Sequence, residues 1–462
     1  MSFQQGLSGL NMAAKTLDIL GNNIANAQTV GFKAGGAKFA DIYASTMMTT
    51  LQQIGQGSTV MAVAQTFTQG NITSTNNPLD IAINGEGFLR FQPSLTDATP
   101  LYSRNGQLHL NAEGYLVNAQ DKFLAVYPSP EGVTIDNTVA RPLRLPMTPL
   151  PPRQTGTLEQ TEQLTGGVFV GANLNFGDRR AMNVDPNNTS WQALLPWNPA
   201  AIDPAMYNYS TSLNVFDQVG EPHVLTMYFI RTGDSNTGPQ QREWQVKFML
   251  DNRYEIQNFY DADGNGNPLL QFDPTGRPDN SVYGSRFRLD LQSTLDVLGG
   301  PGDLTDPNGL ALFDVNIPMN VDFSKMTQFA TNYDVHTLSQ DGYAPGAISG
   351  IDIARNGLIT GRYSNGRAQL LGQVPLTIFR NPHGLIPLGD NLYAPSIYAG
   401  DPLEAVAGAG ARGSITAGSV EEANVDLTKE LVDMITAQRT YQANVQTIKT
   451  QDSIMQAIVN LR

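Results

Sequence analysis

The two ends of the chain share one helical pattern, and this pattern constrains the fold more than any other feature. Near the start, apolar residues recur at steps of three and four, at Leu10, Ala13, Leu17, Leu20, Ile24 and Ala27. Near the finish the same rhythm runs through Leu427, Leu431, Met434, Tyr441, Val445, Ile448, Met455 and Val459, interrupted only by Gln438 and Asp452. This spacing places one side chain per turn on a single helical face, as in a coiled-coil seam. We therefore predict a helix at each end and expect the two to pair.

The closing helix carries more apolar surface than one partner helix can cover. A hairpin of two helices inside one globular core remains an alternative, but it needs only one apolar face on each helix. From residue 427 to 462 the helix is about 54 Å long, and a broad apolar face of that length favours packing against copies of the chain. The predicted self-assembly residues are Leu10, Leu17, Leu20, Ile24, Leu427, Leu431, Met434, Tyr441, Val445, Ile448, Ile454, Ile458 and Leu461.

Between the predicted helices the sequence is typical of β-structure with many turns. Short apolar runs at residues 80–83 and 88–91 flank a turn signal at 84–87. A proline-rich stretch around residues 142–152 interrupts this pattern of short apolar runs and turn signals, which returns after about residue 343. We infer one β-domain built from two separated segments, with a second β-domain inserted between them.

The predicted fold is α+β, with long terminal helices paired as a coiled-coil-like bundle and two mostly β domains, the outer inserted in the inner. Its parts are an N-terminal assembly helix (1–33), a connector (34–70), an inner β-domain (71–149, continued with a linker in 344–420), an inserted outer β-domain (150–343) and a C-terminal assembly helix (421–462). Repeated Asn and Gly31 indicate the end of the first helix. Asn424 or Asp426 can cap the second. The connector lacks a clear period, so we expect it to order only against its neighbours.

Charge and cysteine content exclude several functions. The net charge of −14 argues against a nucleic-acid partner. The terminal segments are near neutral, at +1 for residues 1–70 and −2 for 421–462, so charge does not oppose their pairing. The absence of Cys excludes disulfides, thiolate metal sites and Cys nucleophiles. No run approaches the ~18 apolar residues of a membrane span, and no basic segment precedes an apolar one, so we expect neither a span nor a cleaved signal peptide.

Two stretches resemble ligand-binding motifs, but each lacks residues or flanking elements that the corresponding site requires. Residues 261–267 match the start of an EF-hand loop, but Phe272 stands where calcium needs a bidentate Glu, so we interpret a β-turn and leave weak ion binding open. Residues 408–413 satisfy GxGxxG without a flanking strand and helix, which favours a flexible linker. We interpret Glu421 and Glu422 as charges at the positive end of the closing helix. The four His are scattered, and we predict no enzyme activity, catalytic residue, cofactor or metal.

The segments at both ends resemble a known family. Residues 10–33, LNMAAKTLDILGNNIANAQTVGFK, are similar to the N-terminal signature of flagellar rod and hook proteins, and residues 419–452, SVEEANVDLTKELVDMITAQRTYQANVQTIKTQD, to the closing helix of that family. The opening MSFQQGLSGLN and the internal segments NNPLDIAINGEGF, QDGYAPG and YSNGR resemble hook proteins in particular. The resemblance covers roughly half the chain, and residues 150–343 are less specific.

This resemblance implies a structural subunit of the curved tubular flagellar hook, the universal joint that passes motor torque from rod to filament. It implies an extracellular location after export through the flagellar export apparatus. The implied partners are further copies of the chain, the distal rod protein, the hook–filament junction protein and the hook cap. The alternatives are a distal rod protein of the same family, an oligomeric extracellular β-rich protein that binds carbohydrate or calcium, and a hydrolase with an unrecognised site in the acidic middle.

The exposed seams generate a first prediction. In an isolated monomer, roughly the first 30–70 and the last ~40 residues should be largely unfolded, because seams without partners do not offset the loss of chain entropy. Limited proteolysis should trim both ends and leave a β-rich core. Ends that resist protease in a proven monomer would contradict this expectation.

Overall fold

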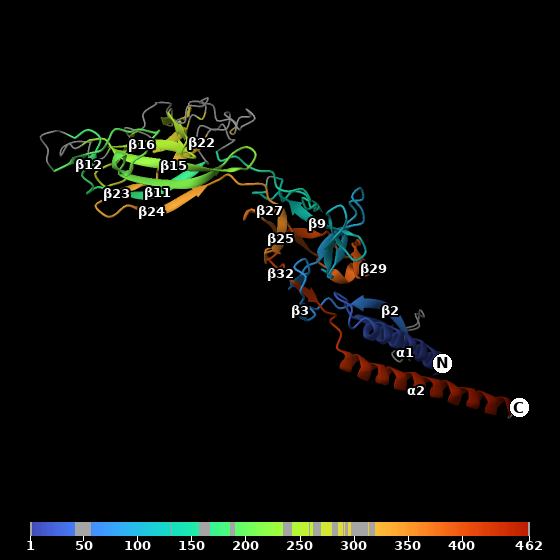
Figure 1. Ribbon diagram of the computed structural model, residues 1–462. Coiled ribbons are helices and arrows are strands. Elements are labelled where there is room, and N and C mark those ends of the chain that lie inside the picture. Colours follow the sequence, from blue (N-terminus) through green and yellow to red (C-terminus); the bar gives the residue numbers. More distant parts are fainter. Residues whose placement is uncertain are drawn as a thin grey trace. The chain divides into compact units, whose positions relative to one another are not determined.

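The computed structural model describes residues 2–41, 57–130, 132–156, 167–184, 190–233, 243–257, 259–261, 269–279, 285–289, 291, 294–296, 313 and 319–460. The chain divides into two compact units, unit 1 (Met1–Met147 and Ile348–Arg462) and unit 2 (Thr148–Ala347). The predicted insert, 150–343, falls inside unit 2. The terminal helices are in contact and the parts between them are rich in strands, so the predicted α+β class is confirmed (Figure 1).

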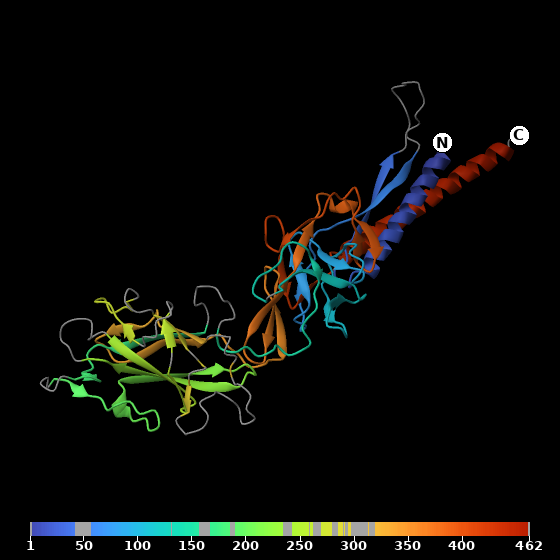
Figure 2. The same ribbon diagram turned by 90° about the horizontal axis from the view of Figure 1, so that it is seen from above.

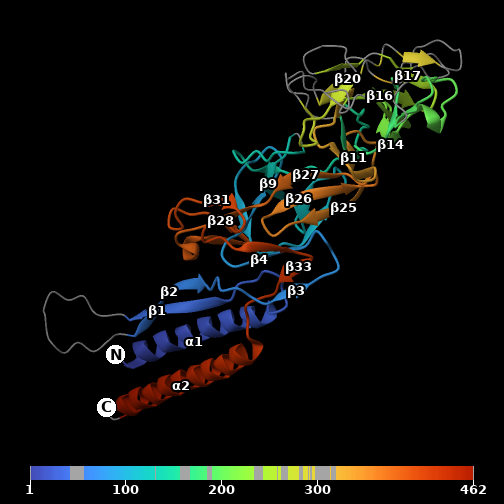
Figure 3. The same ribbon diagram turned by 90° about the vertical axis from the view of Figure 1, so that its left-hand side faces the viewer.

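Helix α1 (Ser2–Ala25) and helix α2 (Leu427–Asn460) lie side by side and antiparallel in unit 1 (Figures 2 and 3). Helix α1 ends two residues before the predicted Ala27, and the chain then turns through Gly31, whose φ of +73° favours glycine. A Cβ there would also lie 2.6 Å from the backbone nitrogen of Asn105. Asp426 caps α2, since its Oδ1 accepts the N–H groups of Thr428 at 2.9 Å and Lys429 at 3.2 Å.

The predicted connector contains a pair of antiparallel strands that the sequence pattern did not reveal. Strand β1 (Gly35–Asp41) pairs with β2 (Ser58–Gln65), and both contact α1. Figure 3 shows the two strands along α1 on a side other than that occupied by α2. The backbone N–H of Ser58 donates to Ser8 Oγ at 3.4 Å. The connector therefore orders against a helix of its own chain.

Both segments of unit 1 contribute to the same sheets. Their other strands are β3 (Ile72–Ser74), β4 (Ile81–Asn84), β5 (Leu89–Gln92), β6 (Leu101–Ser103), β7 (Leu108–Leu110), β8 (Leu116–Asn118), β9 (Phe123–Pro128), β10 (Arg141–Pro142), β25 (Ile348–Ile353), β26 (Leu358–Tyr363), β27 (Ala368–Gln373), β28 (Pro375–Ile378), β29 (Ile386–Gly389), β30 (Leu392–Ala394), β31 (Leu403–Val406), β32 (Ser414–Ala417) and β33 (Ser419–Glu421), with the 3-10 helix η3 (Pro382–Gly384). Strand β27 pairs with β9, β32 with β4, and β33 with β3, all antiparallel. Residues 408–413, predicted as a flexible linker, instead form a turn between β31 and β32 in which Gly408 N donates to Gly413 O at 2.8 Å.

Unit 2 is built from two sheets around one core. Its strands are β11 (Val168–Asn175), β12 (Arg180–Ala181), β13 (Gln192–Ala193), β14 (Tyr209–Phe216), β15 (Pro222–Arg231), β16 (Glu243–Leu250), β17 (Tyr254–Ile256), β18 (Phe259–Asp261), β19 (Leu269–Gln271), β20 (Arg286–Leu289), β21 (Thr294–Asp296), β22 (Met319–Asp322), β23 (Thr327–Phe329) and β24 (Asp334–Gln340), with the 3-10 helix η1 (Pro204–Met206). One sheet centres on β11 and the other on β15 and β16. Trp244, Phe248 and Phe323 are fully buried between them. Residues 262–268 of the EF-hand-like stretch lie outside the described residues.

The entry and exit segments of unit 2 are hydrogen-bonded to each other. Leu150 N donates to Gly346 O at 2.7 Å, and Gly346 N donates back to Leu150 O at 3.2 Å. Arg153 and Tyr343 exchange two further backbone bonds, each of 2.9 Å. The chain therefore enters and leaves unit 2 through two neighbouring antiparallel segments.

A buried ion cluster joins the terminal helices to the β-part of unit 1. The Glu421 carboxylate, at the end of β33, accepts hydrogen bonds from Lys33 Nζ at 2.6 Å, Arg104 Nη1 at 3.2 Å and Gly70 N at 2.9 Å. The side chains of Glu421 and Lys33 are fully buried and that of Arg104 is 3 % exposed. The backbone of Glu421 also accepts the N–H of Gly31 at 2.7 Å. One carboxylate thus connects the segments that follow α1 and precede α2.

This cluster corrects the interpretation of Glu421 as a charge at the start of a helix. Glu421 lies in a strand, six residues before α2 begins, and its partners come from three distant segments. Burial lowers the pKa of Lys33 below its ordinary value, while the ion pair with Glu421 opposes that shift. Glu422, next in sequence, is exposed.

The side-chain amide of Asn424, close to Glu421 in sequence, forms hydrogen bonds with the connector. Its Oδ1 accepts the N–H of Ala34 at 2.7 Å, and its Nδ2 donates to the carbonyl of Thr66 at 2.7 Å. Asn424 therefore links the segment just before α2 to the start of β1 and the end of β2, while the capping role belongs to Asp426.

Replacing Glu421 with Gln should destabilise unit 1 by about 3–5 kcal/mol, because two buried cations lose their counter-charge. The exposed neighbour provides the control, since Glu422→Gln should change stability little. Calorimetry of the full chain should show one transition moved to lower temperature. All three Trp residues lie in unit 2, so the midpoint measured by tryptophan fluorescence should stay unchanged. A calorimetric profile like that of the parent would show that the cluster does not hold unit 1 together.

Candidate assembly surface

Small residues bring α1 and α2 close together. A Cβ added at Gly9 would lie 2.9 Å from the side-chain amide of Asn444, and one added at Gly6 would lie 3.2 Å from Cγ1 of Ile448. Ala13 and Ala437 are buried on the same two helices. The contact therefore depends on residues with little or no side chain, and the large apolar residues flank it.

Asn23 fixes the register of three elements. Its side chain, in α1, accepts the N–H of Gly35 and donates to the carbonyl of Gly35, both at 2.9 Å, as a neighbouring strand would. The same Nδ2 atom donates to Glu430 Oε2 of α2 at 3.1 Å. Asn23 is only 2 % exposed, so these bonds satisfy a polar group that would otherwise be costly to bury. The amide links α1, β1 and α2 at one point.

The structure covers the predicted self-assembly residues to different extents. Leu20 is buried. The half-buried residues are Leu10, Leu17, Ile24, Met434, Tyr441, Val445 and Ile448. Leu427 and Leu431 are each 44 % exposed and Ile454 is 46 % exposed. The side chain of Ile458 and the whole of Leu461 lie outside the described residues. The middle of the predicted seam therefore lies in the helix pair, while the first part of its α2 stripe stays uncovered.

Helix α2 extends beyond its partner. Gly6 faces Ile448, which leaves four residues of α1 before that point but twelve residues of α2 after it. The surplus of eight residues is about 12 Å of helix. Ile454 and Met455 lie in this overhang, and Met455 is 60 % exposed. No residue of α1 is available to cover them within the described pair.

The exposed apolar residues of α2 form more than one patch. Ile435 and Ile454 are 48 % and 46 % exposed, but their separation of nineteen positions turns the helix so that they point about 100° apart. The broad apolar face predicted for the closing helix is therefore divided into separate patches. Leu7 of α1, 44 % exposed, adds a further apolar site that the sequence pattern did not single out.

Sequence reasoning missed the residues that make the contact close. Gly6, Gly9 and Ala13 recur at steps of three and four, and this small-residue pattern was the available signal. Asn23 and Asn444 carried no signal of their own, because their roles depend on partners far away in sequence.

The described residues contain no group of three or more His, Asp or Glu that could hold a metal ion. Among them, no helix combines the length and the apolar character that crossing a membrane requires.

Family models match successive parts of the chain. They are described as flagella basal body rod protein (residues 3–33), flagellar hook protein FlgE/F/G D1 domain (82–143), flagellar basal body protein FlaE D2 domain (183–343) and flagellar basal body rod FlgEFG protein C-terminal (416–461). The order of these matches follows the chain from α1, through both units, to α2.

Relatives match over the whole length. The chain is 35 % identical to the flagellar hook protein FlgE of Escherichia coli K12 and 34 % identical to that of Salmonella typhimurium LT2, with 100 % of both chains covered in each case. Among solved structures, the Helicobacter pylori flagellar hook protein FlgE2 is 14 % identical, with a TM-score of 0.48 over 74 % of this chain and 98 % of that one.

Replacing Gly9 with Leu should force α1 and α2 apart, at a cost of about 1–3 kcal/mol for overpacking. The fraction of protein that sediments as assembled material should fall. Shortening the residue it meets, in a Gly9→Leu/Asn444→Ala double variant, should restore part of the loss. The control is Gly21→Leu in the same helix, where a Cβ would meet no described atom within 4 Å. Unimpaired assembly of Gly9→Leu would show that the helices do not need this close approach.

Proposed function

Because the chain belongs to the flagellar hook protein family, we propose that its helix pair is the surface through which copies of the chain assemble into the hook. The chain is a hook subunit, a structural protein of bacterial motility and not an enzyme, and the resemblance seen in its sequence is confirmed. Membership implies a homopolymer. Full-length similarity to hook proteins favours this function over a distal rod protein or an extracellular binding protein.

The observation that carries the proposal is the apolar surface that remains on the paired helices. Although α1 and α2 are in contact, large apolar side chains such as Leu427 and Leu431 are 44 % exposed. Burial of apolar surface contributes about 25 cal/mol per Å², which favours packing against helices of neighbouring copies. A contact between different surfaces of identical subunits generates a helical polymer when the rotation that it imposes does not close into a ring.

The distribution of charge supports different roles for the two units. Unit 2 contains 11 basic and 23 acidic residues, a net charge of −12, while unit 1 has a net charge of only −2. Neighbouring copies of unit 1 therefore approach with little electrostatic repulsion. We assign the terminal segments 1–33 and 421–462 to the core of the polymer. Unit 2 is assigned to its solvated outer part, where its contacts set curvature and stiffness.

The finer details follow from the family alone. The subunit serves as a universal joint that passes torque from rod to filament. Its partners are the distal rod protein, the hook–filament junction protein, the hook cap and the flagellar export apparatus. Export through the flagellar export apparatus places it outside the cell.

Replacing Val445 with Asp should block polymerisation and leave a folded, secreted monomer. The carboxylate would enter the half-buried middle of the seam without a cationic partner, which costs several kcal/mol or forces the group to become neutral. Electron microscopy of purified protein should show tubes for the parent and none for the variant, with circular dichroism reporting unchanged β-structure.

The matched control is Gln442→Asp, one turn away on an exposed position of the same helix, which should have a milder effect. A Val445→Asp protein that forms tubes like the parent at neutral pH would show that the seam is not an assembly surface.

A further inference from the structure

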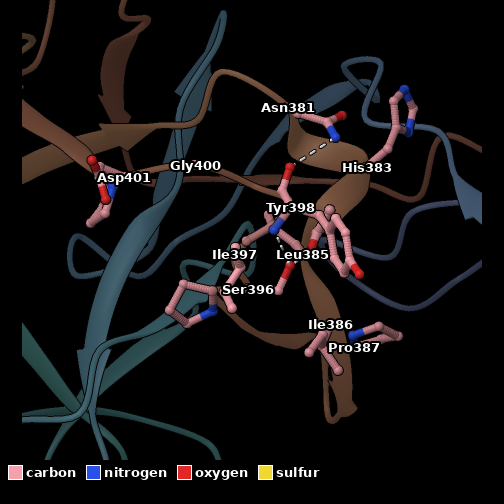
Figure 4. Close-up of a pocket in the computed structure, with 13 residues that line it drawn as sticks. Asn381, His383, Leu385, Ile386, Pro387, Ser396, Ile397, Tyr398, Gly400 and Asp401 are labelled. Atoms are coloured by element: carbon pink, nitrogen blue, oxygen red, sulfur yellow. Dashed lines mark hydrogen bonds between the residues drawn. The ribbon is translucent and has the colours of Figure 1, made fainter.

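Unit 1 carries a second apolar surface, far in sequence from the helices. A depression of about 990 Å³ lies between two segments, residues 381–387 around η3 and the start of β29, and residues 395–402 before β31 (Figure 4). Ile397 and Tyr398 are 98 % and 83 % exposed, and Ile386 is 50 % exposed. We call these two segments and the depression between them the 381–402 surface.

The backbone that presents Ile397 and Tyr398 is held in place. Ser396 Oγ donates to the carbonyl of Gly384 and accepts the N–H of Tyr398, the latter at 3.1 Å. Asn381 Nδ2 donates to the carbonyl of Tyr398 at 3.0 Å, the bond drawn in Figure 4. Ala399 is fully buried directly after the two exposed residues. The exposed side chains therefore project from a constrained loop.

Prolines reinforce this constraint. Pro395 and Pro402 stand at the two ends of the loop, and each fixes one backbone dihedral angle. A loop that is already ordered loses little conformational entropy when its side chains become buried, so binding through it is less costly. Tyr is also among the residues most often dominant in binding energy at interfaces.

The chemistry of the surface selects its partner. Among the lining residues, Asp401 is the only acidic residue, no Lys or Arg is present, and most of the others are apolar. Contiguous apolar patches of this kind mark interaction sites. A partner of opposite charge has little to bind here. Because the chain carries a net charge of −14, a contact between two copies meets the least electrostatic repulsion where charge is sparse.

We propose that the 381–402 surface receives a second copy of this chain, in a contact separate from the one made by the helices. The inference rests on the proposed function, because it requires the chain to form a homopolymer. The contact joins this surface to a different surface of the neighbouring copy, as a helical polymer requires. Ile397 and Tyr398 are the residues on which it depends.

The test combines crosslinking with assembly of the full chain. A photoreactive p-benzoylphenylalanine replacing Ile397 should give covalent dimers of the chain when the polymer is irradiated. The same probe at Gln107, an exposed polar residue of unit 1, provides the control for random collision and should give few. Mass spectrometry of the adduct should identify a peptide of this chain.

Assembly provides an independent measurement. Ile397→Asp should raise the critical concentration for polymerisation several-fold, while Gln107→Asp should not change it. Because the Ile397 side chain is almost fully exposed, the thermal unfolding of the monomer should match the parent.

The possible failures are distinguishable. If Val445→Asp blocks polymerisation while Ile397→Asp assembles like the parent and its probe gives no dimer, the helix surface stands and the 381–402 surface is not a subunit contact. Adducts formed only with another flagellar protein would likewise overturn the proposal. If the parent chain does not polymerise, both proposals are wrong.

Discussion

The buried carboxylate of Glu421 is the interaction on which the arrangement of unit 1 depends. Four segments that are distant in sequence meet at this group: the turn after α1, the end of the connector, the segment just after β6 that contains Arg104, and the strand before α2. A buried cluster with two cations and one anion is costly to desolvate, and it persists only if its geometry and hydrogen bonds are good. The cluster specifies one relative position for the end of α1 and the start of α2. Asn424 and Asn23 extend the same specification to the strands of the connector.

Helices α1 and α2 contact each other closely, but their contact does not form a full hydrophobic core. Glycine and alanine at the interface bring the backbones together but bury little apolar surface. The larger residues around them then form patches that the described residues of one chain leave exposed. The near-neutral charge of unit 1 opposes contact between copies little, which supports the proposed assembly through these patches, while the charge of the acidic unit 2 favours solubility. The proposal therefore assigns assembly to one part of the sequence and solubility to another.

The sequence alone predicted those elements that local periodicity determines, namely the terminal helices and the β-rich middle. The helices were found because steps of three and four repeat over many turns, and the β-rich middle because turn signals bound short apolar runs. The β1–β2 pair was missed because the connector is rich in Gly, Thr and Gln, and its two strands show no clear alternation and pack on α1. The role of Glu421 was misread because two adjacent Glu residues before a helix look like terminal charges. Only the positions of Lys33, Gly70 and Arg104 reveal the buried cluster. Gly6 and Gly9 matter through the atoms they face, which no single sequence displays.

The paired entry and exit segments of unit 2 have a consequence for how hook proteins diversify. Backbone bonds between Leu150 and Gly346, and between Arg153 and Tyr343, hold the two crossing points together whatever lies beyond them. An insertion, deletion or exchange within unit 2 therefore alters neither the connectivity nor the register of unit 1. Evolution can lengthen, shorten or replace the inserted module while unit 1 remains under separate selection.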